Sequence, residues 1–228
     1  MSMIDADMAQ PGLTIVANSQ KTGKGQRGRN WVDTPGQSLL MSIIICPNRP
    51  LNEQFIFNAS AANAIADVLH ELYKNWDIRI KWPNDIIVND KKAGGVLIEN
   101  VLRGNKWVYS IIGLGLNIKQ EEFSMELPFA TSLKIGSGKG FEISELLKLL
   151  REKILEYTNA SSSANRIMEE YNEHLYRRGE IQSFTDSKNE WDAIILGVNN
   201  DGTLKVQTEE GRIVSYTHGS ILWNWGLK

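Results

Sequence analysis

The sequence predicts an α+β protein: a larger domain with a mixed β-sheet and helices on one side, followed by a small β-barrel. Three observations support this fold class. Short apolar runs bounded by turn signals recur in the first half of the chain, which is typical of strands. Three longer segments carry apolar residues at helical spacing. After Gly179, short strand-like segments alternate with polar turns.

The first half of the chain reads as strands around one long helix. The predicted strands are 13–17, 38–46, 78–82, 85–88, 94–100 and 106–112, the last two forming a hairpin. From Phe55 to Tyr73, apolar residues recur every three or four positions, so they share one face of a helix over 53–76. Pro47 and Pro50 end the strand before this helix, because proline cannot donate to a ladder.

The second half predicts two helices and then the barrel. Ser144 is a candidate N-cap for a helix over 144–157, and a helix over 164–176 ends before Gly179. The predicted barrel strands are 180–184, 191–198, 203–208 and 212–216. We assign residues 1–178 to the larger domain and 179–228 to the barrel, which at roughly fifty residues is too small to be stable without docking on the larger domain.

Composition excludes several classes of protein. The chain has 228 residues, 23% of them charged, and a net charge of −2, whereas dedicated nucleic-acid binders usually carry a basic excess. Cys46 is the single cysteine, so no internal disulfide or cysteine zinc site can form, and its apolar surroundings predict burial. No segment approaches about 18 consecutive apolar residues, and the start lacks the pattern of a signal peptide. We therefore expect a cytoplasmic protein without a membrane span.

The most informative segment is a basic, glycine-rich loop over residues 20–31. It reads Gln-Lys-Thr-Gly-Lys-Gly-Gln-Arg-Gly-Arg-Asn-Trp. Glycine lets the backbone approach a ligand closely, and the interleaved cations favour phosphate or carboxylate. The loop has neither the Walker A pattern nor the spacing of a dinucleotide-binding loop. Alone, it indicates an anion-binding loop or a solvated basic hairpin.

Two further motifs place polar side chains at strand ends. In Lys81-Trp82-Pro83-Asn84-Asp85, the proline breaks the strand and turns Asn84 and Asp85 outward, although such residues are often only turn formers. In the segment over 92–99, Lys92 enters a strand through Gly94 and Gly95, which leave room for a ligand. The alternative for this lysine is a solvated side chain beside a β-bulge.

The last motif is Gly113-Leu114-Gly115-Leu116-Asn117-Ile118, in which alternating glycines lie in a strand. Asn117 offers both a donor and an acceptor, or it is simply a turn residue at a close strand crossing. Each of the four motifs is weakly specific by itself. A ligand site formed by all four would join a basic loop, a lysine and an aspartate.

In this order and spacing, the four motifs resemble the biotin protein ligases. That family carries Gly-Arg-Gly-Arg-x-Gly-Arg-x-Trp, then Lys-Trp-Pro-Asn-Asp, Lys-x-x-Gly-Ile-Leu-x-Glu and Gly-x-Gly-Ile-Asn. The resemblance is strong over residues 14–118 and continues into the barrel, which looks like the family's SH3-like domain. It implies the mixed sheet shared by class II aminoacyl-tRNA synthetases and biotin ligases.

The resemblance implies an ATP-dependent ligase that acts in two steps. Biotin and ATP, accompanied by Mg²⁺, would form biotinoyl-5′-adenylate, and a lysine of a biotin carboxyl carrier protein domain would then attack it. The larger domain, 1–178, would be catalytic. The chain would resemble the group without a DNA-binding domain, so no specific DNA binding is expected. A homodimer through an exposed sheet edge is a further expectation.

The resemblance also assigns roles to residues. The catalytic residues would be Lys92, Arg29 and Asp85. Biotin would be bound by Gln20, Gly23, Lys24, Gly25, Gln26, Lys92 and Gly94. ATP and the adenylate would be bound by Lys24, Arg27, Arg29, Trp31, Asn84, Lys92 and Asn117. No metal ligands are predicted, because His70, His174 and His218 show no metal-ligand spacing.

The chain departs from the family pattern in two places. Lys24 and Gln26 stand where the family usually has arginine, so we expect a weaker hold on the adenylate. The family also has a Ser-Thr-Asn strand and a helix before the first strand seen here. Without that segment, biotin affinity should be lower.

Three alternatives stay open from the sequence. A lipoate–protein ligase shares the architecture and the adenylate chemistry. A non-catalytic carrier-binding module would keep the docking surface but not the activity. Nucleic-acid binding by the basic loop and barrel is disfavoured by the net charge.

Overall fold

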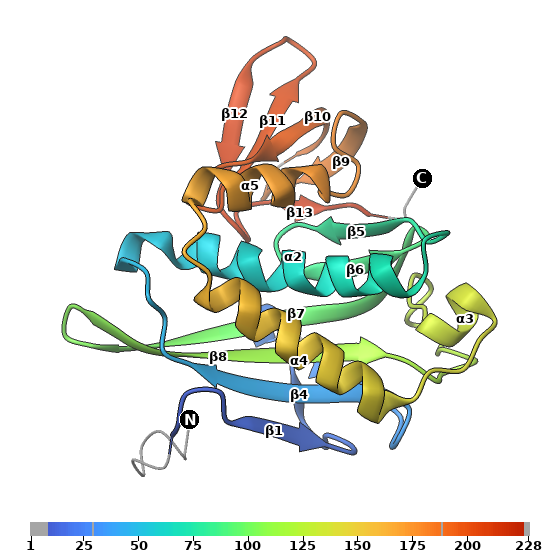
Figure 1. Ribbon diagram of the computed structural model, residues 1–228. Coiled ribbons are helices and arrows are strands. Elements are labelled where there is room, and N and C mark those ends of the chain that lie inside the picture. The colour runs from blue at the N-terminus through green and yellow to red at the C-terminus, as the bar shows by residue number, and fades with distance from the viewer. Residues whose placement is uncertain (1–8, 29, 188, 226–228) are drawn as a thin grey trace.

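A six-stranded antiparallel sheet forms the centre of the larger part of the protein. The computed structural model describes residues 9–28, 30–187 and 189–225 (Figure 1). In spatial order the strands are β1 (Thr14–Ala17), β4 (Ser38–Ile45), β8 (Lys106–Asn117), β7 (Lys91–Arg103), β6 (Asp85–Val88) and β5 (Ile78–Lys81). The α+β class is confirmed. The sheet is antiparallel rather than mixed, because short turns connect β5, β6, β7 and β8 in succession.

Helices cover one face of this sheet (Figure 1). The long helix α2 (Gln54–Leu72) follows a 3₁₀ turn (Leu51–Glu53) and packs against α4 (Ile143–Asn159) and α5 (Ala164–Glu173). The predicted apolar face of α2 is buried over the middle of the helix, while Phe55 and Leu72 at its ends are half-buried and Tyr73 lies beyond its last residue. Strand β4 is almost entirely buried beneath α4, which explains its continuous apolar sequence.

Several boundaries differ from the prediction. Helix α4 begins at Ile143 after Glu142, so Ser144 lies inside the helix and is not its cap. The five-residue helix α3 (Leu133–Ser137) was not predicted, because it is too short to show periodicity. Its N-cap is Ser132, whose hydroxyl accepts from the Ile135 N–H at 3.1 Å. Cys46 is exposed rather than buried, because it follows the last residue of β4.

A second sheet of five antiparallel strands forms the C-terminal part. Its spatial order is β12 (Ile213–Tyr216), β11 (Leu204–Thr208), β10 (Glu190–Val198), β9 (Ile181–Thr185) and β13 (Leu222–Trp223). The four predicted strands are present with small shifts at their ends. β13 was missed, because two residues carry no detectable alternation. None of the helices in the described residues combines the length and apolarity that crossing a membrane requires.

Polar contacts dock this second sheet on the first part of the chain. The Trp82 indole N–H donates to the Gly202 carbonyl at 2.9 Å. Asn172, on α5, accepts from the Val198 N–H at 2.7 Å and donates to the Val198 carbonyl at 3.1 Å. In Figure 1, α5 lies between α2 and the strands of the second sheet. The docking brings turns of the second sheet next to the predicted motifs.

Candidate active site

A cavity of about 1020 Å³ lies where the basic loop, the sheet and the C-terminal strands meet. The loop contributes β2 (Gly23–Lys24), a 3₁₀ turn (Gln26–Gly28) and β3 (Asn30–Trp31), which form a small ribbon. The predicted site residues that line the cavity are Gln20, Lys24, Gly25, Gln26, Arg27, Trp31, Asn84, Asp85 and Lys92. Gly113 and Gly115 of the last motif also line it, so the structure brings residues of all four motifs together at one cavity.

Lys92 and Asp85 form a direct ion pair on the cavity wall. The distance from Lys92 Nζ to Asp85 Oδ1 is 2.6 Å. The register between β6 and β7 shifts here, since Ile86 pairs with Gly94 but Ile87 pairs with Lys92. Ala93 is the extra residue of this β-bulge. In a regular strand Lys92 and Gly95 would lie on opposite faces of the sheet, but the bulge puts them on the same face. The sequence offered a β-bulge at Gly94 and Gly95 as an alternative to a ligand site, but the bulge lies at Ala93 and aims the lysine into the cavity.

Hydrogen bonds hold the turn that carries Asp85. The side-chain amide of Asn84 donates to the Val96 carbonyl, and the Val96 N–H donates to the Asn84 carbonyl at 2.9 Å. The Tyr171 hydroxyl of α5 donates to the Pro83 carbonyl at 3.1 Å. Burial raises the pKa of Tyr171, so this hydroxyl stays a donor at physiological pH. The turn is fixed to both β7 and α5.

The basic loop needs glycine for close approach at Gly23. A Cβ atom on Gly23 would lie 2.6 Å from the Trp31 carbonyl oxygen and 2.8 Å from Oε1 of Gln20. Arg27 adopts a left-handed backbone with φ 56°, and its guanidinium group fills the space that a side chain on Gly219 would occupy. The loop therefore touches the C-terminal strands through Arg27.

Trp31 covers Gly115 in the floor of the cavity. A Cβ atom on Gly115 would lie 2.7 Å from Cε2 of Trp31. The indole nitrogen of Trp31 and Oε1 of Gln26 are buried, and neither has a hydrogen-bond partner among the described residues. A buried polar atom without a partner costs about 1–3 kcal/mol. A ligand that bonds these atoms would remove that cost.

Sequence reasoning did not find the contribution of the C-terminal strands. Lys81 lines the cavity, and its Nζ lies 4.8 Å and 5.3 Å from the ring centroids of Trp223 and Trp225. His218 also lines the cavity and meets Trp82 edge-on at 5.5 Å between ring centroids. The alternation of two tryptophans near the end of the sequence is the signal that would have indicated a shared face.

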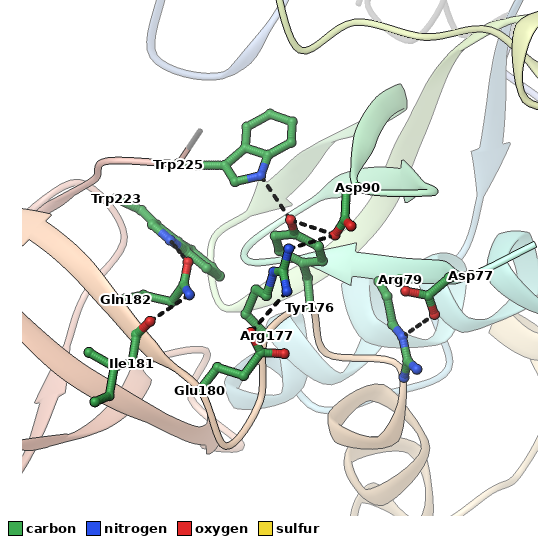
Figure 2. A network of polar contacts seen from close by, with 10 residues as sticks. All are labelled: Asp77, Arg79, Asp90, Tyr176, Arg177, Glu180, Ile181, Gln182, Trp223 and Trp225. Carbon is green, nitrogen blue, oxygen red and sulfur yellow. Dashed lines mark hydrogen bonds and ion pairs between the residues drawn. The ribbon is translucent and has the colours of Figure 1, made fainter. Parts of the chain in front are cut away.

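A network of hydrogen bonds and ion pairs holds the indole ring of Trp225 in place (Figure 2). Its indole N–H donates to the Tyr176 hydroxyl at 3.2 Å, and that hydroxyl donates to Asp90 at 3.0 Å. Arg177 also bonds Asp90 at 2.9 Å and ion-pairs with Glu180. Because Arg177 and Glu180 lie between α5 and β9, the network ties this connection to the β6–β7 turn.

Three predicted site residues in the described part of the chain do not line the cavity: Gly23, Gly94 and Asn117. Gly94 is buried, and a Cβ there would lie 2.8 Å from the Gly115 carbonyl oxygen, so it is Gly95 that lines the cavity. Asn117 is buried with its amide donating to the Thr131 carbonyl at 3.0 Å. Its contact with adenine stays a prediction. Arg29 lies outside the described residues.

Comparisons with known sequences agree on one family. The model of the biotin/lipoate A/B protein ligase family matches residues 3–117, just over half of the chain. The bifunctional ligase/repressor BirA of Bacillus subtilis is 28% identical over 211 residues, which cover 89% of this chain. The biotin–[acetyl-CoA-carboxylase] ligase of Mycobacterium tuberculosis is 26% identical over 157 residues, covering 66% of this chain and 57% of that protein. This chain spans 64% of the length of the Bacillus relative.

Solved structures share the fold. The biotin protein ligase from Aquifex aeolicus in complex with biotin and ATP has a TM-score of 0.79 and 24% identity, covering 95% of this chain and 90% of that chain. A Helicobacter pylori biotin acetyl coenzyme A carboxylase synthetase with bound biotinylated ATP has a TM-score of 0.60 and 22% identity, with 94% and 91% covered. At these identities, the structures establish the fold alone. Since the family model matches more than half of its residues, the chain belongs to the biotin/lipoate A/B protein ligase family.

Proposed function

We propose that this chain is a biotin protein ligase, which uses ATP to attach biotin to a lysine of a biotin carboxyl carrier protein domain. The observation that carries the proposal is the Lys92–Asp85 ion pair on the wall of a cavity that the basic loop also lines. An ammonium group aimed into such a cavity suits a reaction that joins two anions. The names of the curated relatives and the ligands of the Aquifex structure support biotin and ATP as the substrates.

In the first step, a carboxylate oxygen of biotin attacks the α-phosphorus of ATP. The bond from this phosphorus to the oxygen that bridges to the β-phosphate breaks, and pyrophosphate leaves with Mg²⁺, which enters with ATP as part of the substrate. Lys92 would lie between the two anions and stabilise the charge that develops on the α-phosphate. Lys24, Arg27 and Arg29 would hold phosphates, and Trp31 would cover the adenine.

In the second step, the carrier lysine attacks the acyl carbon of biotinoyl-5′-adenylate. The amine must lose a proton, the bond from the acyl carbon to the phosphate oxygen breaks, and AMP leaves. Once Lys92 has turned to the phosphate, Asp85 can accept the proton of the incoming ammonium. Gly23 and Gly25 give the basic loop the close approach that keeps water from the mixed anhydride. Gln20 and Gln26, which line the cavity, complete the proposed biotin contacts.

The remaining assignments follow from the same proposal. We divide the chain into a catalytic domain, 1–178, and an SH3-like domain, 179–228, because the six-stranded and five-stranded sheets separate near Gly179. A homodimer would use the edge strand β1, where Ile15 and Val16 are exposed. The carrier domain, absence of specific DNA binding and a cytoplasmic location also belong to the proposal.

The test is biotin transfer to a purified carrier domain with ATP and Mg²⁺, detected with streptavidin. The Lys92→Ala variant should lose adenylate formation by about 10²- to 10³-fold, the usual cost of removing a group that stabilises the transition state. Lys91→Ala is the matched control, since Lys91 is the preceding residue of β7 and is exposed. Equal activity of the two variants would exclude the proposed role of Lys92.

Competition between biotin and lipoate tests the substrate. Pyrophosphate exchange into ATP reports adenylation of either acid without a carrier. Exchange that depends on biotin and is unaffected by lipoate supports the proposal. Exchange that depends on lipoate would identify a lipoate ligase, and no exchange with either acid would favour a non-catalytic module.

A further inference from the structure

A cluster of side chains outside the cavity gathers where three helices meet. Asp67 lies on α2, while Glu170 lies on α5 and His174 directly follows the last turn of α5. Each side chain offers one ligand atom, and these atoms all lie within 4.8 Å of one another. The spacing of the histidines in the sequence did not reveal this group, because it contains only one of them, His174. Its other members are the carboxylates of Glu170 and of Asp67, which is distant in sequence.

The helices hold the three side chains in a fixed arrangement. Glu170 and His174 are four residues apart, so they lie on the same side of α5. Asp67 reaches them from α2, which packs against α5, and its Oδ1 lies 3.3 Å from Nε2 of His174. The ring of His70, one turn after Asp67, stacks on the ring of His174 with 5.5 Å between centroids. A second imidazole therefore lies beside the group.

The third helix orients Asp67. The Tyr157 hydroxyl of α4 donates to Oδ2 of Asp67, which leaves Oδ1 on the side of His174. Burial and the bond to Asp67 raise the pKa of Tyr157, so it stays protonated as a donor. A hydrogen bond from an outer residue to a ligating carboxylate is a usual feature of metal sites.

The charge around the cluster favours a cation. The carboxylates of Asp67 and Glu170 offer oxygens within 4.8 Å of each other, and two negative charges this close repel unless a cation lies between them. Two cations approach: Arg166, whose charge acts on Glu170, and Lys153, whose charge acts on Asp67. The ammonium group of Lys153 also forms ion pairs with Glu71, at 3.9 Å, and with Glu156, at 3.6 Å. The side chains of Asp67 and His174 are 28% and 17% exposed, so an ion can reach them from solvent.

We propose that Asp67, Glu170 and His174 bind a divalent first-row transition metal ion, with Zn²⁺ as the ion to test. One imidazole nitrogen and two carboxylate oxygens form a donor set that suits such ions, and Zn²⁺ binds it with three protein ligands and an open position. The two negative charges balance those of the metal. Mg²⁺ is less suited, because it prefers oxygen ligands throughout.

The metal would act as a clamp between α2 and α5, and it takes no part in the ligation reaction. Helix α5 carries Tyr171, which bonds the Pro83 carbonyl, and Asn172, which bonds Val198 in the second sheet. An ion that fixes α5 on α2 therefore stabilises the support of the Asp85 turn. Its effect should appear as metal-dependent stability of the folded chain.

The experiment measures Zn²⁺ binding to the whole chain after treatment with a chelator, in the absence of ATP. We expect one Zn²⁺ per chain by calorimetry, a melting temperature that rises with Zn²⁺ concentration, and a visible absorption band when Co²⁺ replaces Zn²⁺. Glu170→Gln and His174→Gln should each weaken binding by at least about tenfold, the lower limit seen even for outer residues of metal sites. Glu173→Gln, an exposed neighbour on α5, is the matched control and should bind as the wild type does.

Two results would overturn the proposal: no binding by the wild-type chain, or binding that Glu170→Gln and His174→Gln leave unchanged. Circular dichroism checks that each variant is folded. If a ligand variant does not fold, Tyr157→Phe provides the decisive measurement. It keeps all three ligands and should weaken Zn²⁺ binding by about 10- to 100-fold, and unchanged affinity would again contradict the site.

Discussion

Lys92 and Asp85 lie 2.6 Å apart, from Nζ to Oδ1, on facing strands of one hairpin. The pair exists because the bulge at Ala93 turns Lys92 to the cavity side of the sheet. Its side chains are 34% and 17% exposed, so both groups can be reached by a ligand. An anion entering the cavity would compete with Asp85 for Lys92, and this exchange would release a carboxylate.

Replacement of Asp85 by asparagine should separate the two steps of the proposed reaction. In adenylate formation, the substrate anions replace Asp85 as partners of Lys92, so the rate should change less than about tenfold. In transfer to the carrier, the lost proton acceptor should cost about 10²- to 10⁴-fold, the usual contribution of a general base. Single-turnover transfer from preformed adenylate, compared with pyrophosphate exchange, measures both.

Asp77→Asn is the control for this variant. Asp77 is also ion-paired, with Arg79 at 2.7 Å (Figure 2). It is exposed and is not among the residues that line the cavity. Both steps should proceed at the wild-type rate. If Asp85→Asn slows adenylate formation and transfer equally, Asp85 only orients Lys92 and is not a proton acceptor.

An alanine at Gly115 should weaken ATP binding through Trp31. The added Cβ would lie 2.7 Å from the indole ring, and the two-stranded ribbon that carries Trp31 should yield before the central sheet does. Overpacking costs about 1–3 kcal/mol. We expect ATP affinity to fall by about 5- to 150-fold, which corresponds to that energy. Calorimetric titration with ATP measures the change.

Gly113→Ala serves as the control on the same strand and face. Its Cβ would meet the Leu97 carbonyl oxygen at 3.3 Å and would not approach Trp31. We expect a smaller loss of ATP affinity. Equal losses for both variants would mean that the displacement of Trp31 does not govern ATP binding.

Replacement of Trp82 by phenylalanine should reveal the energy of one contact between the two sheets. The variant loses the bond from the indole nitrogen to the Gly202 carbonyl, 2.9 Å long. Trp76→Phe is matched to it, because Trp76 is 3% and Trp82 4% exposed, and the Trp76 nitrogen has no hydrogen-bond partner in the described part of the chain. Both variants remove the same atoms from a buried indole.

The free energy of unfolding in urea should therefore fall further for Trp82→Phe than for Trp76→Phe. The difference should be about 1 kcal/mol, the net worth of a hydrogen bond. If the two variants are equally stable, the bond to Gly202 contributes nothing to docking.

The sequence was sufficient to predict most of the helices and strands, and part of the cavity wall. Strand alternation, helical spacing and glycine-rich motifs are local signals, and they predicted strands over 85–88 and 94–100. The pairing of these strands as the β6–β7 hairpin that carries Asp85 and Lys92 was not predicted. The hairpin register was not predictable, because the bulge at Ala93 depends on pairing with both neighbouring strands. The antiparallel order of the sheet likewise depends on contacts that no single segment encodes.

Contacts between distant segments were beyond sequence reasoning. Lys81 meets Trp223 and Trp225 only because the second sheet folds back over the first. The group of Asp67, Glu170 and His174 forms by packing of two helices whose spacing patterns are independent. In both cases the local sequence around each residue gives no sign of the contact, because the partner is brought near only by tertiary packing.

A final prediction concerns Gln26, which stands where related ligases usually have arginine. Its Oε1 is buried, lines the cavity and has no hydrogen-bond partner among the described residues. In Gln26→Arg, a guanidinium group would face the adenylate phosphate, and a hydrogen bond to a charged group contributes about 1.5–3 kcal/mol. Release of the adenylate should slow by about tenfold or more. Rapid gel filtration of labelled adenylate bound to the enzyme measures this rate, with Gln26→Met as a control of similar length and no charge. If Gln26→Arg releases the adenylate as fast as the wild type does, the absence of an arginine at this position does not determine how tightly the adenylate is bound.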